Sequence, residues 1–218
     1  MMNGTLILPF ADEVKKACAS FNSGMNEPDP ALFKLFEQYP GNTNLSEVLL
    51  KVVTLNALYS TRIWVNSKYL PTDLKYAPTV YDVVKHIVDL KIDAALSRAD
   101  EALVAGIANV KIAGKDHYYY SFATKYCSFH RPESYPIFDQ RVKEYLWQLR
   151  NQDGGLRRRF QQQVLWNYPE LKRIINDMRD QYSLQKFSYK QIDAFFYLEG
   201  GKLLAAKEKK QQTESHTV

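Results

Sequence analysis

The 218-residue sequence is poor in the residues that mark several protein classes. It has only two cysteines, Cys18 and Cys127, far apart and outside any CxxC or HxxxH pattern. We therefore expect neither a disulfide framework nor a structural zinc site, and a reducing compartment fits. No apolar run approaches the roughly 20 residues of a membrane span, and the first residues lack a basic leader with a small-residue cleavage site. These absences predict a cytoplasmic protein without membrane contact.

Glycine and proline are also scarce, at nine residues each. Strand-like patterns are limited to TLILPF, residues 5–10, and LQKFSY, residues 184–189. Helix-length amphipathic runs dominate instead, which predicts an all-α fold. The length suits one compact helical domain over residues 1–206, with two possible lobes, about 42–140 and 1–41 plus 141–206. Residues 207–218 are polar, and we expect a disordered tail there.

Capping residues and apolar periodicity predict where the helices lie. Asp12, Asp29, Thr79 and Ser188 are expected N-caps, and Asp29 is followed by a proline, which is favoured at the first helical position. Asn44 with Glu47, and Asn167 with Glu170, have the spacing of capping boxes. The helices that we expect cover about 12–22, 30–40, 45–63, 79–88, 93–105, 116–130, 138–150, 168–180 and 188–199.

The formal net charge of +5 is too small to identify a nucleic-acid-binding protein, but its distribution is uneven. Residues 141–173 contain eight basic side chains against three acidic ones. Such a stretch is typical of phosphate contacts, although a solvated helix face has the same composition. The basic residues are Arg141, Lys143, Arg150, Arg157, Arg158, Arg159, Lys172 and Arg173.

The segment from Lys111 to Val142 combines a turn around Gly114, an aromatic helix and a proline-bounded loop that ends at Asp139. In the turn IAGK, residues 112–115, and the approach YPIFD, residues 135–139, the chain resembles the helix-hairpin-helix (HhH-GPD) DNA glycosylase superfamily. The resemblance implies a two-lobed helical fold with a cleft between the lobes. It implies that Gly114 and Lys115 bind a DNA phosphate and that Asp139 is catalytic.

The same resemblance extends to two other helices. The run Leu55–Ile63 is similar to the helix that fills the gap left by the flipped base, and Arg62 to the residue that reaches the opposite strand. The helix from Tyr189 to Glu199 would cover the mouth of the active site. The family usually has two glycines in its hairpin, whereas this chain has Gly114 alone, so an ordinary interhelical turn is an alternative for residues 112–115.

The chemistry of Asp139 agrees with this resemblance. Cleavage of an N-glycosidic bond develops positive charge on the sugar, and a nearby carboxylate stabilises that charge. An aspartate at a helix N-terminus stays ionised because the helix dipole and free N–H groups favour the anion. Pro136 restricts the backbone that leads to it. The alternative is a plain helix N-cap, worth about 1 kcal/mol.

A nucleophilic lysine, which bifunctional relatives place a little under twenty residues before the aspartate, is absent at the matching positions Tyr120 and Ser121. Lys115 comes too early. Lys125 shares a helical row with Tyr118, Phe122 and Phe129, so it is expected to be desolvated. It is either an amine nucleophile or half of a buried ion pair. We favour the ion pair, and thus a monofunctional enzyme that uses water.

Several further side chains are candidates for contact with DNA. His117, Tyr118, Tyr119 and Phe138 could form a base pocket, because flipped bases stack on aromatic rings, although an aromatic helix is more often core. Cys127 and His130 lack a third partner and are expected in the core or at its rim. We predict no metal, no iron–sulfur cluster and no other cofactor. Arginines expected to contact DNA are Arg62, Arg141, Arg157 and Arg158.

These features predict a monomeric DNA N-glycosylase that flips a damaged or modified base and cleaves its glycosidic bond with the help of Asp139. The alternatives are a non-catalytic nucleic-acid-binding module and a helical protein–protein adaptor. Two kinds of excised base fit the sequence: an oxidised purine, which would indicate base excision repair, and a modified phage cytosine, which would indicate defence.

Overall fold

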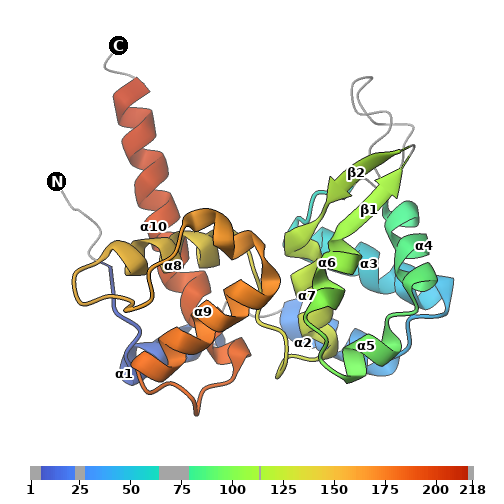
Figure 1. The fold of residues 1–218 in the computed structure, drawn as a ribbon, viewed down its shortest axis with the longest axis horizontal. Coiled ribbons are helices and arrows are strands. Elements are labelled where there is room, and N and C mark those ends of the chain that lie inside the picture. The colour runs from blue at the N-terminus through green and yellow to red at the C-terminus, as the bar shows by residue number, and fades with distance from the viewer. Residues whose placement is uncertain (1–5, 23–27, 64–78, 113, 216–218) are drawn as a thin grey trace. The chain divides into compact units, whose positions relative to one another are not determined.

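The computed structural model describes residues 6–22, 28–63, 79–112 and 114–215. Within these ranges the protein consists of helices and one two-stranded sheet, so the predicted all-α class is confirmed (Figure 1). None of the helices in these ranges is long and apolar enough to cross a membrane. The chain divides into two compact units. Unit 1 comprises residues 1–26 and 137–218, and unit 2 comprises residues 27–136.

The boundaries of the units differ from those of the expected lobes. Residues 28–41, which we placed with the chain termini, belong to unit 2 because α2 (Pro28–Gln38) packs on α3 (Leu45–Tyr59) and α7 (Tyr120–His130). Phe36 of α2 contacts Tyr126 and Phe129 of α7, with ring centroids 5.3 and 5.6 Å apart. Aromatic packing between segments far apart in the sequence therefore decides where unit 2 begins.

Local capping explains where α3 and α4 of unit 2 begin. The Asn44 side chain accepts hydrogen bonds from the N–H groups of Ser46 and Glu47 at the start of α3. Thr79 and Asp82 form a capping box at α4 (Val80–Leu90). The expected helix over 93–105 is instead two helices, α5 (Asp93–Ser97) and α6 (Ala102–Ala108), because the Asp100 carboxylate accepts from Ala102 N and begins a new one.

The segment after α6 differs most from the prediction. Residues 109–118 form an antiparallel hairpin of β1 (Asn109–Ile112) and β2 (Lys115–Tyr118), with Asn109 opposite Tyr118 and Ile112 opposite Lys115. The expected interhelical turn is thus the tip of a β-ribbon, and Gly114 adopts φ +77° there. The aromatic helix, expected from residue 116, begins at Tyr120. The two strand-like patterns of the sequence form no strand in the described residues: residues 6–10 and 184–188 are irregular, and Tyr189 begins α10.

A buried polar cluster joins α3 and α7 in unit 2. Lys51 is fully buried, and its Nζ donates to Tyr39 O (2.9 Å), Gly41 O (2.8 Å) and Asn42 Oδ1 (2.8 Å). The Asn42 amide is oriented by Asp93, whose Oδ1 accepts from Nδ2 at 2.6 Å. Tyr126 Oη donates to Asn42 Oδ1, and His130 Nε2 lies 3.1 Å from the same oxygen. Asn42 Oδ1 is therefore the acceptor around which the cluster is organised.

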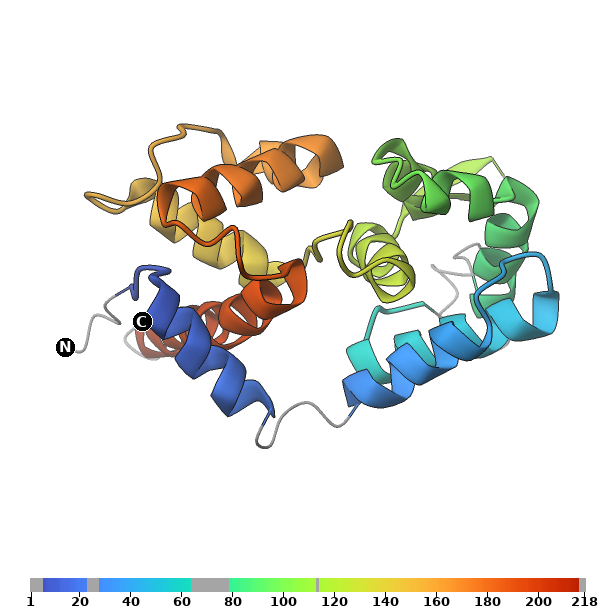
Figure 2. The same ribbon diagram turned by 90° about the horizontal axis from the view of Figure 1, so that it is seen from below.

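Unit 1 is built around the long helix α10 (Tyr189–Ser215), which packs against α8 (Gln140–Asn151) and α1 (Ala11–Asn22). Figure 2 shows α1 alongside α10. The rings of Phe195 and Phe196 on α10 contact Tyr145 of α8, at centroid distances of 5.2 and 5.4 Å. The 3₁₀ helix η3 (Gln162–Trp166) and α9 (Tyr168–Gln181) complete the unit. Asn167 caps α9 by accepting from Glu170 N, as expected.

The expected disordered tail is wrong for residues 207–215, which continue α10. Lysine, glutamate and glutamine, which dominate this stretch, are good helix formers. Lys207 also pairs with Glu144 of α8, with Nζ 3.1 Å from Oε2. The Gly200–Gly201 pair, before which we expected the helix to stop, lies inside α10. Helix propensity and one tertiary ion pair thus extend the helix beyond the predicted end.

Candidate active site

Asp139 is the N-cap of α8, as the sequence predicts. Its Oδ1 accepts hydrogen bonds from the backbone N–H groups of Arg141 (2.9 Å) and Val142 (3.0 Å). Oδ2 forms none of the hydrogen bonds found among the described residues, and the side chain is half-buried. One carboxylate oxygen is thus fixed by the helix, while the other is available to a bound molecule.

The backbone that leads to Asp139 is firmly held. Pro136, Ile137 and Phe138 are all buried, so the carboxylate stands at the end of an anchored segment. Phe138, which we expected in a base pocket, is only 1 % exposed and packs on Trp166 of η3, with ring centroids 4.9 Å apart. Burial argues against a pocket-lining role for Phe138. Trp166, at 41 % exposed, is the accessible aromatic ring here, and no spacing pattern in the sequence indicates it.

Arg141 lies two residues after Asp139 on α8. Its guanidinium lies over the ring of Tyr197 on α10, with Cζ 4.0 Å from the centroid. The side chain is half-buried and forms no ion pair with the described residues. Of the predicted DNA-binding arginines, this one lies nearest in sequence to the candidate catalytic aspartate.

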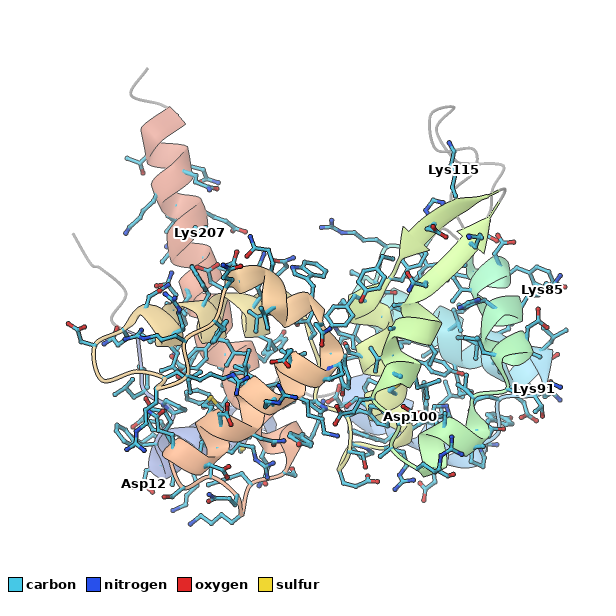
Figure 3. All side chains as sticks on the ribbon, in the orientation of Figure 1. Asp12, Lys85, Lys91, Asp100, Lys115 and Lys207 are labelled. Carbon is cyan, nitrogen blue, oxygen red and sulfur yellow. The ribbon has the colours of Figure 1, made fainter. Side chains whose placement is uncertain are left out.

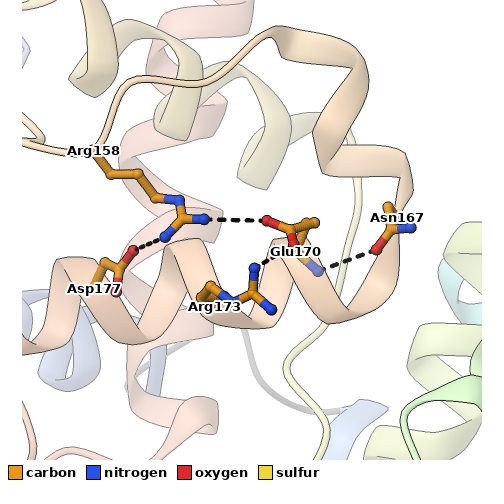
Figure 4. A network of polar contacts seen from close by, with 5 residues as sticks. All are labelled: Arg158, Asn167, Glu170, Arg173 and Asp177. Atoms are coloured by element: carbon orange, nitrogen blue, oxygen red, sulfur yellow. Dashed lines mark hydrogen bonds and ion pairs between the residues drawn. The ribbon is translucent and has the colours of Figure 1, made fainter.

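The other arginines of the basic stretch differ in what they contact. Arg158 pairs with Asp177 (2.7 Å) and Glu170 (3.2 Å), and Glu170 also pairs with Arg173 (Figure 4). Two carboxylates therefore pair with the Arg158 guanidinium, and its role as a phosphate contact stays a prediction. Arg157 donates its backbone N–H to Gln181, and its side chain is exposed. Part of the basic stretch is therefore an internal ion-pair network of unit 1.

The predicted phosphate-binding turn is exposed in unit 2. Lys115 stands at the tip of the β-ribbon, and its side chain points away from the strands (Figure 3). Lys111 and Asp116 face each other across the ribbon, with Nζ 3.4 Å from Oδ1. A Cβ at Gly114 would meet no atom within 4 Å, so the tip is open. A β-ribbon is a shape that enters nucleic-acid grooves, but it is not the helix–hairpin–helix geometry that the resemblance implies.

The remaining aromatic candidates lie at the base of the same ribbon. Tyr118 is 46 % exposed and stacks on the buried Tyr120, with centroids 5.5 Å apart and planes within 8°. His117 belongs to β2, and Tyr119 precedes α7; both are half-buried. Tyr118 is not on the helix, so the predicted row with Lys125 begins at Phe122. An exposed ring on a buried one forms a flat surface on which a base could stack.

Lys125 is only 3 % exposed in α7. Its Nζ donates to Ser121 Oγ at 2.7 Å and lies 5.8 Å from the ring centroid of Tyr59. Asp29, which we expected to be an N-cap, is instead a buried residue within α2 that accepts a hydrogen bond from Tyr59 Oη. The burial of Lys125 keeps solvent and large substrates away from its amine.

Arg62 lies beyond the helix on which we placed it. Helix α3 ends at Tyr59, and Ser60 and Arg62 adopt left-handed φ values of 48° and 64°. The Asn56 side chain fixes this turn by accepting from Ile63 N (3.0 Å) and donating to Ile63 O (2.9 Å). Arg62 is exposed. The apolar stripe to Ile63 that we interpreted as one helix is thus a helix followed by a tight turn.

The candidate residues fall into two groups. Asp139, Phe138, Arg141, Arg157 and Arg158 belong to unit 1. The remaining candidate site residues belong to unit 2, and they are Arg62, Gly114, Lys115, His117, Tyr118, Tyr119 and Lys125.

Comparison with known proteins places the chain in a family. A family model described as HI_0787_N, N-terminal domain, matches residues 13–134. An uncharacterized protein of Haemophilus influenzae is 32% identical over 160 residues, which span 73% of this chain and 69% of the relative. The chain belongs to the HI_0787_N family. No solved structure matches it.

The HI_0787_N match covers most of α1 and nearly all of unit 2, but it ends before Asp139. The β-ribbon and the Lys51 cluster therefore lie inside the family domain. Asp139 and Arg141 lie outside it.

Proposed function

We propose that the protein is a DNA N-glycosylase in which Asp139 stabilises the positive charge that develops on the sugar. The observation that carries this proposal is the geometry of Asp139: one oxygen is fixed by two backbone N–H groups, and the other makes no hydrogen bond with the described residues. Such a preorganised carboxylate costs little reorganisation when charge develops next to it.

In the proposed reaction the C1′–N bond breaks, and its electron pair leaves with the base. The base takes up a proton, while water bonds to C1′ and loses one. Asp139 stabilises the cationic sugar between these events. Lys125 donates to Ser121 and is almost completely buried, which favours the water-using, monofunctional reaction over attack by its amine. The proposal includes a cytoplasmic location, where a bacterial protein reaches the nucleoid.

The substitution Asp139→Asn tests the proposal, because asparagine caps helices as well as aspartate does. We expect base release to fall by about a hundredfold or more, with an unchanged melting temperature. The measurement is mass spectrometry of bases released from DNAs that carry oxidised purines or modified cytosines. Asn167→Asp, at the corresponding cap of α9, is the control and should keep full activity.

Two results would reject an enzymatic role: no base released by the wild-type protein, or equal release by the Asp139→Asn variant. The exposed β-ribbon then favours the second candidate, a non-catalytic nucleic-acid-binding module, because Lys111, Lys115 and Tyr118 are all exposed on it. That module would bind DNA with a steep salt dependence and leave its bases intact.

A further inference from the structure

Helix α10 approaches α8 unusually closely at Gly200. A Cβ at this position would lie 2.4 Å from the carbonyl oxygen of Arg141 and 2.9 Å from its Cβ. Any side chain would thus push the two helices apart. Glycine inside a helix costs roughly 0.5–1 kcal/mol relative to alanine, so the close approach gives a physical reason for this residue.

The side chain of Arg141 lies along α10 beside this contact. Its guanidinium covers the ring of Tyr197, one helical turn before Gly200, at 4.0 Å from Cζ to the centroid. Its Nε lies 3.6 Å from where a Cβ of Gly201 would stand. Tyr197 is itself held by Phe21 of α1, with ring centroids 5.3 Å apart. Both the backbone and the guanidinium of Arg141 are therefore positioned by α10.

The Arg141 guanidinium, which lies over the Tyr197 ring, forms no ion pair with the described residues. A guanidinium that contacts a ring through its face leaves its N–H donors available, because they lie in its plane. The backbone N–H of Arg141 is already bound to Asp139. Arg158 contrasts with it, because two carboxylates occupy its donors. A preordered planar fork without a carboxylate partner among the described residues suits a phosphate, which it can bind through two parallel hydrogen bonds.

We propose that Tyr197 and Gly200 are positioning residues that hold the Arg141 guanidinium for a DNA phosphate. The placement of that phosphate next to the nucleotide on which Asp139 acts rests on the proposed function. The phosphate contact itself does not. Because α10 orders the guanidinium in advance, less side-chain entropy is lost when DNA binds.

The experiment measures binding of the full chain to a fluorescein-labelled duplex of undamaged DNA across a series of NaCl concentrations. We expect Arg141→Ala to weaken binding about tenfold and to lower the slope of log K against log salt by about one. Tyr197→Leu should weaken binding about threefold to tenfold, whereas Tyr197→Phe, which keeps the ring, should restore wild-type affinity. The Arg141→Ala/Tyr197→Leu double variant should bind like Arg141→Ala alone.

Tyr189→Leu is the matched control. Tyr189 is on the same helix and also stacks on an arginine, with Arg179 Cζ 4.7 Å from its ring centroid. Arg179, however, donates to the backbone oxygens of Gln185 and Phe187. Both of its Nη atoms thus donate inside the protein, and this variant should keep both the affinity and the salt slope.

Wild-type affinity in both Arg141→Ala and Tyr197→Leu, or no DNA binding by the wild-type protein, overturns the proposal. Fully additive losses in the double variant overturn it too. If Tyr197→Leu does not fold, Arg141→Lys decides: it keeps the charge but loses the planar fork, so wild-type binding would contradict the proposal. The binding assay uses undamaged DNA and needs no base release, so a failure of base release leaves the outcome of this test unaffected.

Discussion

Both units of the protein hold cations against aromatic rings, and Lys51 of unit 2 and Arg141 of unit 1 are held in opposite ways. Lys51 of unit 2 is fully buried, lies 5.6 Å from the Phe36 centroid and donates to three oxygens. Arg141 of unit 1 is half-buried, lies on Tyr197 and makes no ion pair with the described residues. The three N–H donors of Lys51 are occupied within the protein, whereas the guanidinium of Arg141 pairs with no carboxylate among the described residues.

The difference shows that contact with a ring does not reveal what a cation does. Burial lowers the pKa of Lys51 to about 8 against the opposing effect of Asp93, so the folded protein destabilises its charge. Arginine keeps its charge in every protein environment. A buried ammonium whose three donors are occupied has a structural role, and a stacked guanidinium with open donors is suited to an anionic ligand.

The largest effect is expected from Lys51→Met. This change leaves Tyr39 O and Gly41 O without their buried donor, and each unsatisfied group costs about 1–3 kcal/mol. Asn42 Oδ1 also loses a donor but still accepts from Tyr126 Oη. We therefore expect unit 2 to lose about 3 kcal/mol or more. Urea-dependent hydrogen exchange on peptides of α3 and α7 measures it, since the units need not unfold together. The exposed Lys85→Met is the control, and an equal effect of both changes would contradict a structural role for Lys51.

A smaller effect is expected from the titration of His130. Burial, followed by the charge of Lys51, lowers its pKa to about 3. Between that value and about 6.5, the unfolded chain binds a proton that the folded protein does not. Stability thus rises with pH across this window and is lost as the pH falls. Between pH 7 and pH 4.5 the contribution is roughly 2 kcal/mol.

The variant His130→Gln should remove this contribution. Unit 2 of the variant would then lose less stability than the wild type when the pH falls from neutral to 4.5. Hydrogen exchange at the two pH values, corrected for the intrinsic exchange rate, measures the difference. Equal acid sensitivity in both proteins would show that the effect does not come from His130.

The sequence predicts a structural feature well when the residues that determine it lie close together in the chain, and poorly when they lie far apart. The caps Asn44, Thr79 and Asp139 were predictable because each bonds within three residues of itself. The Lys51 cluster was not, because its members come from four separate segments and meet only in the folded unit. The β-ribbon was missed since strands of four residues are too short to show a clear alternation.

Gly200 illustrates the same limit at the candidate site. A Gly–Gly pair after a helical run normally indicates the end of a helix, and we expected the end at Glu199. The helix continues because the missing side chain is required by Arg141, which is distant in the sequence. Asp139 was predictable from the sequence, whereas Tyr197 and Gly200, the residues that we propose to position Arg141, were not.

Gly200→Ala and Gly106→Ala compare the same change in the two units. At Gly200 the added methyl group would clash with the Arg141 backbone, so we expect unit 1 to lose about 1–2 kcal/mol. At Gly106 in α6 it would meet nothing within 4 Å, so unit 2 should gain roughly 0.5 kcal/mol from helix propensity. Hydrogen exchange on peptides of α8 and of α6 measures each change. Equal effects would mean that α10 does not need its close approach to α8.

The smallest effect is expected on the β-ribbon, where cations are neither buried nor stacked. Lys111 and Asp116 form an ion pair of 3.4 Å with side chains 68% and 73% exposed, so Lys111→Ala should change stability by less than about 0.5 kcal/mol. Its effect on DNA binding is a separate question. If the ribbon contacts phosphates, Lys111→Ala and Lys115→Ala should each lower the salt slope by about one. Unchanged slopes beside a reduced slope in Arg141→Ala would place the phosphate contacts in unit 1, where the guanidinium is ordered before DNA arrives.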